Sequence, residues 1–284
     1  MRALLLGLLI ACVPALAAAE IVQQTMGPGI PASAEYLPGA RTKPAVLLIH
    51  GFLQTRDFAT VATLARGLND AGYAVLSPTL SLNVPGRKQS LACEAVHRHG
   101  MDDDVAEIAR WVAWLKTQGH STVVVFGHSF GSLQGLAYLS RNPDPVVKGY
   151  VGVSLIEAQI GGVDRARLIA ELEGRIAQNQ RALIPHPLSF CRKYLTTAEG
   201  LLSYARWGQA EVLTALKRAP VSTRLIMGDV DELASKGWLK ALQHIEVPMA
   251  VIKGANHFMD GEHEFDLLEH ALRHLASFKL VPKR

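Results

Sequence analysis

A serine stands between two glycines where an apolar, β-branched segment gives way to a helical pattern. In the pentapeptide from Gly127 to Gly131, the chain passes from a predicted strand into a helix within very few residues. Such a bend strains the backbone of its central residue, and flanking glycines remove side chains that would collide there. The hydroxyl of Ser129 would then lie at the N-terminus of the helix, where partial positive charge favours a developing anion. The spacing therefore predicts a nucleophilic serine.

Two later segments could complete a nucleophilic site. A serine hydroxyl is activated by a general base, and that base needs an orienting acid. The segment 228–231 (GDVD) follows one predicted strand, and the segment 254–258 (GANHF) follows the last one. Because the carboxyl ends of parallel strands meet at one edge of a sheet, we expect a histidine and two aspartates to lie near Ser129.

The elements that position these residues alternate between strand and helix. Ala45 to Ile49 is a continuous apolar run, which is typical of a parallel strand covered on both faces. The alternation predicts an α/β fold with a mostly parallel, doubly wound sheet. Ser77-Pro78 is expected to end the second strand. The predicted strands are 45–49, 73–76, 122–126, 147–153, 224–227 and 249–252.

Two regions depart from this alternation. Residues 21–37 are expected to add one or two antiparallel strands at the edge of the sheet. Residues 157–219 form a long segment that is mostly helical in pattern and is interrupted by Pro185 and Pro187. We interpret this segment as a helical, cap-like insertion over the carboxyl edge of the strands. Together with residues 87–100, it is the best candidate to shape a substrate pocket.

The G-x-S-x-G pentapeptide, with a strand before it and a helix after it, resembles the nucleophile elbow of the α/β-hydrolase family. The resemblance covers nearly all of the chain after residue 19. In this family the order along the chain is serine, acid, histidine, which implies Ser129 as nucleophile and His257 as general base. The family's G-x-x-D spacing implies Asp231 as the acid, with Asp229 as a close alternative and Glu232 further behind.

The resemblance also implies an oxyanion hole built from main-chain N–H groups. One donor would be the amide of Phe130, directly after the nucleophile. The other would be the amide of Phe52, because His50-Gly51 matches the family's loop after the first long strand. Each such donor contributes about 2.7–4 kcal/mol to the stability of the transition state.

Residues 1–19 have the features of a secretory signal. A basic start precedes an apolar run, and Ala17 to Ala19 form a small-residue cleavage site before Glu20. The run is short for a membrane span. We therefore expect residues 20–284 to be the mature domain, periplasmic or secreted, without a transmembrane segment. A lipidated Cys12 is a second interpretation of the same region.

The predicted export bears on the two remaining cysteines. In an oxidising compartment an even pair suggests a disulfide, so Cys93 and Cys191 are expected to be bridged. Two free, buried thiols are the alternative. A bridge would tie together two long connections between core elements.

Composition and missing motifs argue against several function classes. The formal net charge of +4, without any basic block, argues against binding of nucleic acid. Phosphate-loop and dinucleotide fingerprints are absent, so no cofactor is expected. His97-Arg98-His99 has no ligand partners at zinc spacing and is interpreted as a polar loop. Asp102 to Asp104 are interpreted as the acidic start of a helix, so no metal is expected.

These observations favour an exported serine hydrolase that cleaves small-molecule carboxylic esters through an acyl-enzyme, as a carboxylesterase, a lipase or a thioesterase would. The family also contains peptidases, carbon–carbon bond hydrolases and cofactor-free peroxidases with the same triad. A non-catalytic envelope binding protein with the same fold is a further alternative. Ser129 argues against a dehalogenase or an epoxide hydrolase, in which the family has an aspartate at the elbow.

Overall fold

The computed structural model describes residues 18–161 and 164–278. The predicted signal peptide, as far as residue 17, and Cys12 lie outside the described residues. Across the described ranges, no helix is both long enough and apolar enough to cross a bilayer.

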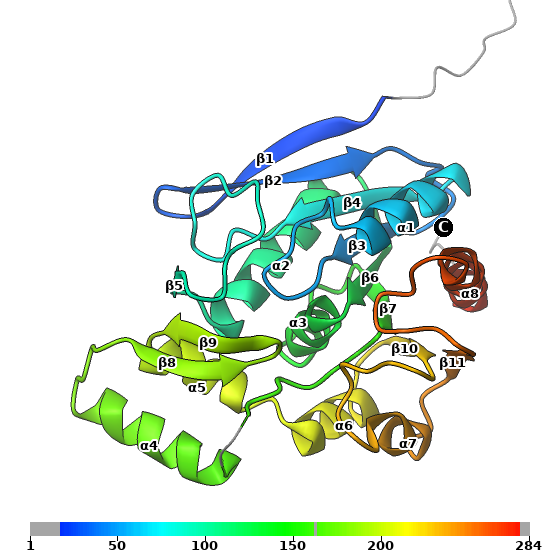
Figure 1. Ribbon diagram of the computed structural model, residues 1–284. Helices are drawn as coiled ribbons and strands as arrows, with labels where there is room; N and C mark the ends of the chain where they lie inside the picture. Colours follow the sequence, from blue (N-terminus) through cyan, green and yellow to red (C-terminus); the bar gives the residue numbers. More distant parts are fainter. Residues whose placement is uncertain (1–17, 162–163, 279–284) are drawn as a thin grey trace, which may run out of the picture.

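An eight-stranded sheet forms the centre of the molecule (Figure 1). At one edge, β1 (Glu20–Gly27) and β2 (Ile30–Leu37) are antiparallel to their neighbours, whereas the remaining strands of this sheet are parallel to one another. The predicted α/β fold and its antiparallel edge strands are therefore confirmed. In spatial order the strands are β1 (Glu20–Gly27), β2 (Ile30–Leu37), β4 (Ala74–Thr79), β3 (Ala45–Ile49), β6 (Val123–His128), β7 (Val147–Val153), β10 (Ser222–Gly228) and β11 (Met249–Ile252).

Helices cover both faces of this sheet, and each face has its own hydrophobic cluster. Along β3, Val46 and Leu48 face one cluster, whereas Leu47 and Ile49 face the other. Because both faces are covered, the strand is apolar without alternation. On the first face lie α1 (Ala59–Asp70) and α8 (His263–Ser277), and on the second lie α2 (Met101–Thr117), α3 (Phe130–Leu139), α6 (Gln209–Lys217) and α7 (Trp238–Gln243).

β4 continues through Ser77-Pro78, so the strand end predicted there is wrong. Pairing of β4 with its parallel neighbour β3 stops at Leu76. Pro78 pairs only with Ala34 of the antiparallel neighbour β2. A proline is tolerated where the ladder requires no N–H from it, and the strand can therefore run through this residue.

The segment predicted as a helical insertion contains a β-hairpin, so the helical interpretation is wrong for residues 184–196. β9 (Cys191–Thr196) pairs with β8 (Ile184–Leu188) and with β5 (Val96–His97) in a small three-stranded sheet. Pro185 and Pro187 lie in β8, at the edge of this sheet, where a missing N–H costs no ladder bond. The turn of the hairpin lies beside α3, and α4 (Arg165–Ala177) and α5 (Ala198–Ala205) complete the insertion (Figure 1).

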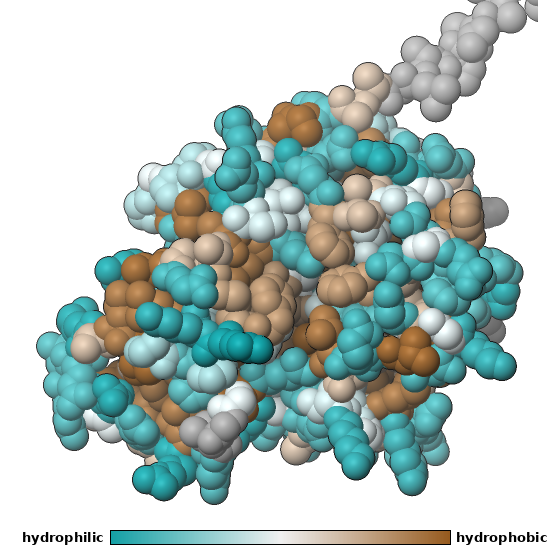
Figure 2. Space-filling view, viewed as in Figure 1, coloured by the Kyte–Doolittle hydropathy of each residue, from teal (hydrophilic) through white to brown (hydrophobic). Residues whose placement is uncertain are grey.

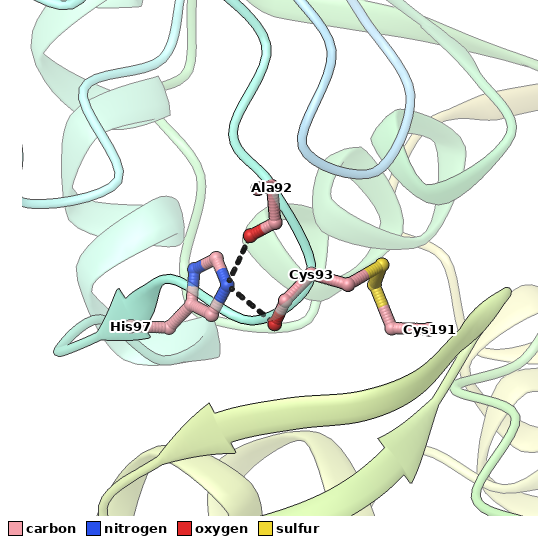
Figure 3. Close-up of a disulfide and its surroundings, with 4 residues drawn as sticks. All are labelled: Ala92, Cys93, His97 and Cys191. Carbon is pink, nitrogen blue, oxygen red and sulfur yellow. Dashed lines mark hydrogen bonds between the residues drawn. A yellow bond between two sulfur atoms is a disulfide. The ribbon is translucent and has the colours of Figure 1, made fainter.

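A disulfide joins Cys93 to Cys191 across 98 residues of sequence (Figure 3). Cys93 lies in the connection between β4 and α2, and Cys191 begins β9. Near the bridge, His97 Nε2 donates to the carbonyl oxygens of Ala92 and Cys93, at 3.1 and 3.3 Å. The bridge therefore ties the hairpin of the insertion to the connection that precedes α2.

Replacing both cysteines by alanine should lower the free energy of unfolding by about 2–4 kcal/mol, because the bridge restricts the unfolded chain. Urea unfolding at matched pH measures this difference. Dithiothreitol should bring the wild-type protein to the stability of the double variant and should leave the double variant unchanged. Equal unfolding free energies in the wild type and the double variant would contradict a stabilising bridge.

Candidate active site

Ser129 occupies the junction between β6 and α3 in a strained backbone conformation. Its φ of 56° and ψ of −126° lie in a region that residues with a side chain rarely adopt. The Ser129 N–H donates to the carbonyl oxygen of Val153 at 2.8 Å. Ser132 Oγ donates to the carbonyl oxygens of Gly127 and Val153, at 2.6 and 2.8 Å. These bonds hold the bend against the neighbouring strand β7.

The two flanking glycines leave no room for a side chain. A Cβ on Gly127 would lie 2.3 Å from the carbonyl oxygen of Gly131. A Cβ on Gly131 would lie 2.3 Å from the carbonyl oxygen of His50. The backbones of β3, β6 and α3 therefore approach each other so closely here that only glycine fits.

Three side chains from three loops meet at this bend. Ser129 Oγ lies 2.7 Å from His257 Nε2, and His257 Nδ1 lies 2.9 and 2.8 Å from the two carboxylate oxygens of Asp231. Because the carboxylate only accepts, Nδ1 carries the proton and Nε2 accepts from the serine hydroxyl. The side chains of His257 and Asp231 are 1% and 3% exposed, so little water competes for these hydrogen bonds.

The loop after β10 directs its two aspartates to different places. Asp231 Oδ1 also accepts from the N–H groups of Leu233 and Ala234, both at 3.0 Å, which orients the carboxylate toward His257. Asp229 is exposed, and its carboxylate accepts from the N–H of Gly254 at 2.6 Å. Asp229 thus links the loops after β10 and β11, while Asp231 contacts the imidazole.

The amide group of Phe52 lies on the loop after β3, and that of Phe130 lies at the N-terminus of α3, directly after the serine. Gly51 approaches so closely that a Cβ there would lie 3.3 Å from the Cβ of Ser129. In the described part of the chain, neither amide N–H donates a hydrogen bond, so both can serve a bound oxygen. The two phenyl rings pack together with 4.8 Å between centroids.

His128 is a supporting residue that the sequence analysis did not single out. It is fully buried, and its Nε2 donates to the carbonyl oxygen of His257 at 3.1 Å. Burial, and then the nearby imidazole of His257, lower the pKa of His128 to about 4. His128 is therefore neutral at physiological pH and holds the backbone of His257. A histidine within an otherwise apolar strand is the only signal of this role in the sequence.

Apolar side chains border the approach to the site. Phe190, in the turn between β8 and β9, is 56% exposed, and its ring lies 5.6 Å from that of Phe52. The turn is anchored by the Ser189 N–H, which donates to the carbonyl oxygen of Gln159 at 2.8 Å. In the space-filling view, apolar residues surround a hollow at the position of α3 (Figure 2). Ser129 itself is 7% exposed.

A separate cavity of about 760 Å³ lies between the end of α3 and the helices α5 and α6. Leu139, Trp207 and Arg218 are among its lining residues, and Ser129 is not. This cavity is therefore distinct from the candidate active site.

The interpretation of residues 97–99 as a polar loop is wrong for both histidines, which are buried. His99 Nδ1 contacts Asp104 at 3.2 Å, and His99 Nε2 contacts the Tyr194 hydroxyl at 3.1 Å. The Tyr204 hydroxyl donates to Asp104 at 2.7 Å. This network joins the insertion to α2. No group of three or more potential ligating side chains that could hold a metal occurs among the described residues.

Comparison with known proteins identifies the family. The model of the alpha/beta hydrolase family matches residues 46–270. The chain belongs to this family. No curated protein matches it in sequence.

Solved structures resemble this α/β hydrolase in fold at low sequence identity. The alpha/beta hydrolase GrgF from Penicillium sp. sh18 is 16% identical, with a TM-score of 0.70 over 93% of this chain and 100% of that chain. Est1E from Butyrivibrio proteoclasticus is 16% identical, with a TM-score of 0.61 over 92% of this chain and 100% of that chain. A monoacylglycerol lipase from Paleococcus ferrophilus is 17% identical, with a TM-score of 0.62 over 87% of this chain and 99% of that chain.

The depressed pKa of His128 predicts a loss of stability in acid. The unfolded chain takes up a proton at this residue below about pH 6.5, whereas the folded protein does so only near pH 4. Stability is therefore lost as the pH falls from about 6.5 to 4. His128→Gln keeps a hydrogen-bond donor and cannot titrate. The unfolding free energy of this variant should therefore fall less steeply with decreasing pH than that of the wild type, and the two slopes should differ by up to about 1.4 kcal/mol per pH unit.

Urea unfolding across this pH range measures the slope. His244 is exposed, so His244→Gln should follow the wild-type curve. A His128→Gln curve parallel to the wild type would show that His128 does not titrate in this way.

Proposed function

We propose that the protein is an exported serine hydrolase that cleaves carboxylic esters, with Ser129 as nucleophile, His257 as general base and Asp231 as the orienting acid. The observation that carries the proposal is the continuous hydrogen-bonded chain from Ser129 Oγ through the imidazole to the carboxylate. A nucleophile, a base and an acid in this order are what acyl transfer requires. A binding protein without catalysis would have no need for this arrangement at a strained serine.

The reaction proceeds in two halves. His257 Nε2 takes the hydroxyl proton while Ser129 Oγ bonds to the acyl carbon, and the carbonyl oxygen becomes an oxyanion held by the N–H groups of Phe52 and Phe130. The oxyanion collapses, the ester bond breaks, and the alcohol leaves with the proton from His257. Water then attacks the acyl-enzyme by the same steps, which releases the acid and restores Ser129.

Asp231 stabilises the imidazolium that forms in each half. Its carboxylate holds the proton on Nδ1, so that Nε2 faces the serine at the start of each step. The buried position of both side chains strengthens this interaction, because little water screens it.

The substrate class is supported by the surface around the site. The exposed ring of Phe190, which lies against the buried ring of Phe52, suits an apolar acyl or alcohol group. Relatives in fold include an esterase domain and a monoacylglycerol lipase by name. Export is supported by the signal-like residues 1–19 and by the Cys93–Cys191 bridge.

Ser129→Ala should abolish labelling by a fluorophosphonate probe and lower the turnover of p-nitrophenyl esters by roughly 10⁶-fold, because no other group replaces the nucleophile. Ser140→Ala, at the other end of α3, should retain both. Short- and long-chain esters measured in parallel define the acyl preference. Labelling that persists in Ser129→Ala would remove this residue from the mechanism.

The two aspartates can be separated by the same assay. Asp231→Asn should lower kcat by about 10⁴-fold, because an amide no longer fixes the tautomer of His257 or stabilises its cation. Asp229→Asn should be close to wild type, since the Asp229 carboxylate accepts from the Gly254 amide whereas the Asp231 carboxylate accepts from His257. A larger loss at position 229 than at position 231 would reverse the assignment of the acid.

A further inference from the structure

Arg87 is a buried cation in the connection between β4 and α2, only 5% exposed. None of the ion pairs in the described part of the chain includes it. Burial lowers its pKa to about 10, so it remains charged at neutral pH. Burying a charge without a directly paired carboxylate is costly. The groups to which Arg87 donates hydrogen bonds must therefore offset the cost of burying its charge.

Three of its hydrogen bonds reach the oxyanion loop, the turn formed by residues 50–54. Arg87 Nη1 donates to the carbonyl oxygen of Leu53 at 3.3 Å. Nη2 donates to the carbonyl oxygen of Gln54 at 2.8 Å and to His50 Nε2 at 3.1 Å. A single planar guanidinium thus holds both ends of this loop.

The same guanidinium is anchored on the segment that follows β4. Nε donates to the carbonyl oxygen of Leu80 at 2.7 Å, and Nη1 donates to that of Gln89 at 3.0 Å. The Leu80 N–H also donates to His50 Nε2, at 3.0 Å. Because Nε2 of His50 accepts from two donors, it carries no proton, and the proton of the neutral ring lies on Nδ1.

His50 transmits this arrangement to the amide of Phe52. His50 Nδ1 donates to the carbonyl oxygen of Gly51 at 2.8 Å. That carbonyl and the Phe52 N–H belong to one planar trans peptide unit, in which the two bonds point in opposite directions. Holding the carbonyl in place therefore also fixes the direction of the N–H. Burial, and then the Arg87 cation, lower the pKa of His50 to about 3. The ring of His50 therefore stays neutral at physiological pH.

We propose that Arg87 is a positioning residue for the oxyanion hole, acting through His50 on the direction of the Phe52 N–H. This inference rests on the proposed function, because it assigns that N–H to the oxyanion. Leu53, next to Phe52, has a φ of 56°, so the loop is strained and needs external support. Without Arg87 the turn relaxes and the Phe52 N–H moves away from Ser129. Substrate still binds, but the tetrahedral intermediate loses a donor.

The test compares Arg87→Gln and Arg87→Lys with Arg56→Gln as a matched control. Arg56 is part-buried beside the same loop, but it donates to Ser33 and Thr79. With a p-nitrophenyl ester, Arg87→Gln should lower kcat about 100-fold with little change in KM. It should weaken binding of a trifluoromethyl ketone, whose hemiketal oxygen occupies the oxyanion hole, by the same factor. Arg87→Lys should be intermediate, and Arg56→Gln should stay within about threefold of wild type.

A double variant tests the connection through His50. Because Arg87 and His50 act on the same amide, Arg87→Gln combined with His50→Gln should be about as impaired as the worse single variant. Losses that multiply, an unchanged ketone affinity in Arg87→Gln, or an equal loss in Arg56→Gln would each overturn the proposal. If Arg87→Gln does not fold, the comparison of Arg87→Lys with Arg56→Gln decides by the same criteria.

Failure of this inference is distinguishable from failure of the proposed function. A wild-type protein that neither hydrolyses esters nor reacts with the fluorophosphonate would refute the proposed function, and with it this role of Arg87. Ester turnover that depends on Ser129 but is unaffected by the Arg87 variants would refute the positioning role alone.

Discussion

The strained backbone of Ser129 is the constraint on which the rest of the structure depends. A positive φ at a residue with a side chain persists only where the surroundings enforce it. Here the Val153 carbonyl holds the Ser129 amide, and Gly127 and Gly131 allow β3, β6 and α3 to meet. The same bend brings the hydroxyl to the carboxyl edge of the sheet, where the loops after β3, β10 and β11 present their groups. The bend that joins β6 to α3 is therefore also the bend that places the Ser129 hydroxyl.

Each group at this edge is held from behind by a buried or main-chain partner. His128 holds the backbone of His257, the amides of Leu233 and Ala234 hold Asp231, and His50 holds the Gly51 carbonyl. Such partners orient dipoles before a substrate arrives, and preorganised dipoles lower the cost of charge that develops during reaction. The burial of uncharged histidines is consistent with this arrangement, because neutral rings provide directed hydrogen bonds without an added charge.

The range of each interaction explains how much could be predicted from the sequence. The elbow and the central strands depend on local spacing, so Gly127 to Gly131 and the apolar runs indicated them directly. The distinction between Asp231 and Asp229 depends on the course of one loop, which spacing alone does not determine. The contacts of Arg87 with Leu53, and those of His99 with Tyr204, join residues 34 and 105 positions apart. No local pattern reveals such partners. The β8–β9 hairpin was missed because prolines usually break strands, whereas an edge strand tolerates them.

The Cys93–Cys191 bridge also places Ser129 in a different covalent section of the chain from Asp231 and His257. It closes a covalent ring that contains Ser129, whereas Asp231 and His257 lie outside that ring. Because α4 lies within the ring, a protease that cuts this helix opens the ring without releasing a fragment. Ser129 and His257 would then lie on different pieces, and the disulfide would be the only covalent link between the two pieces.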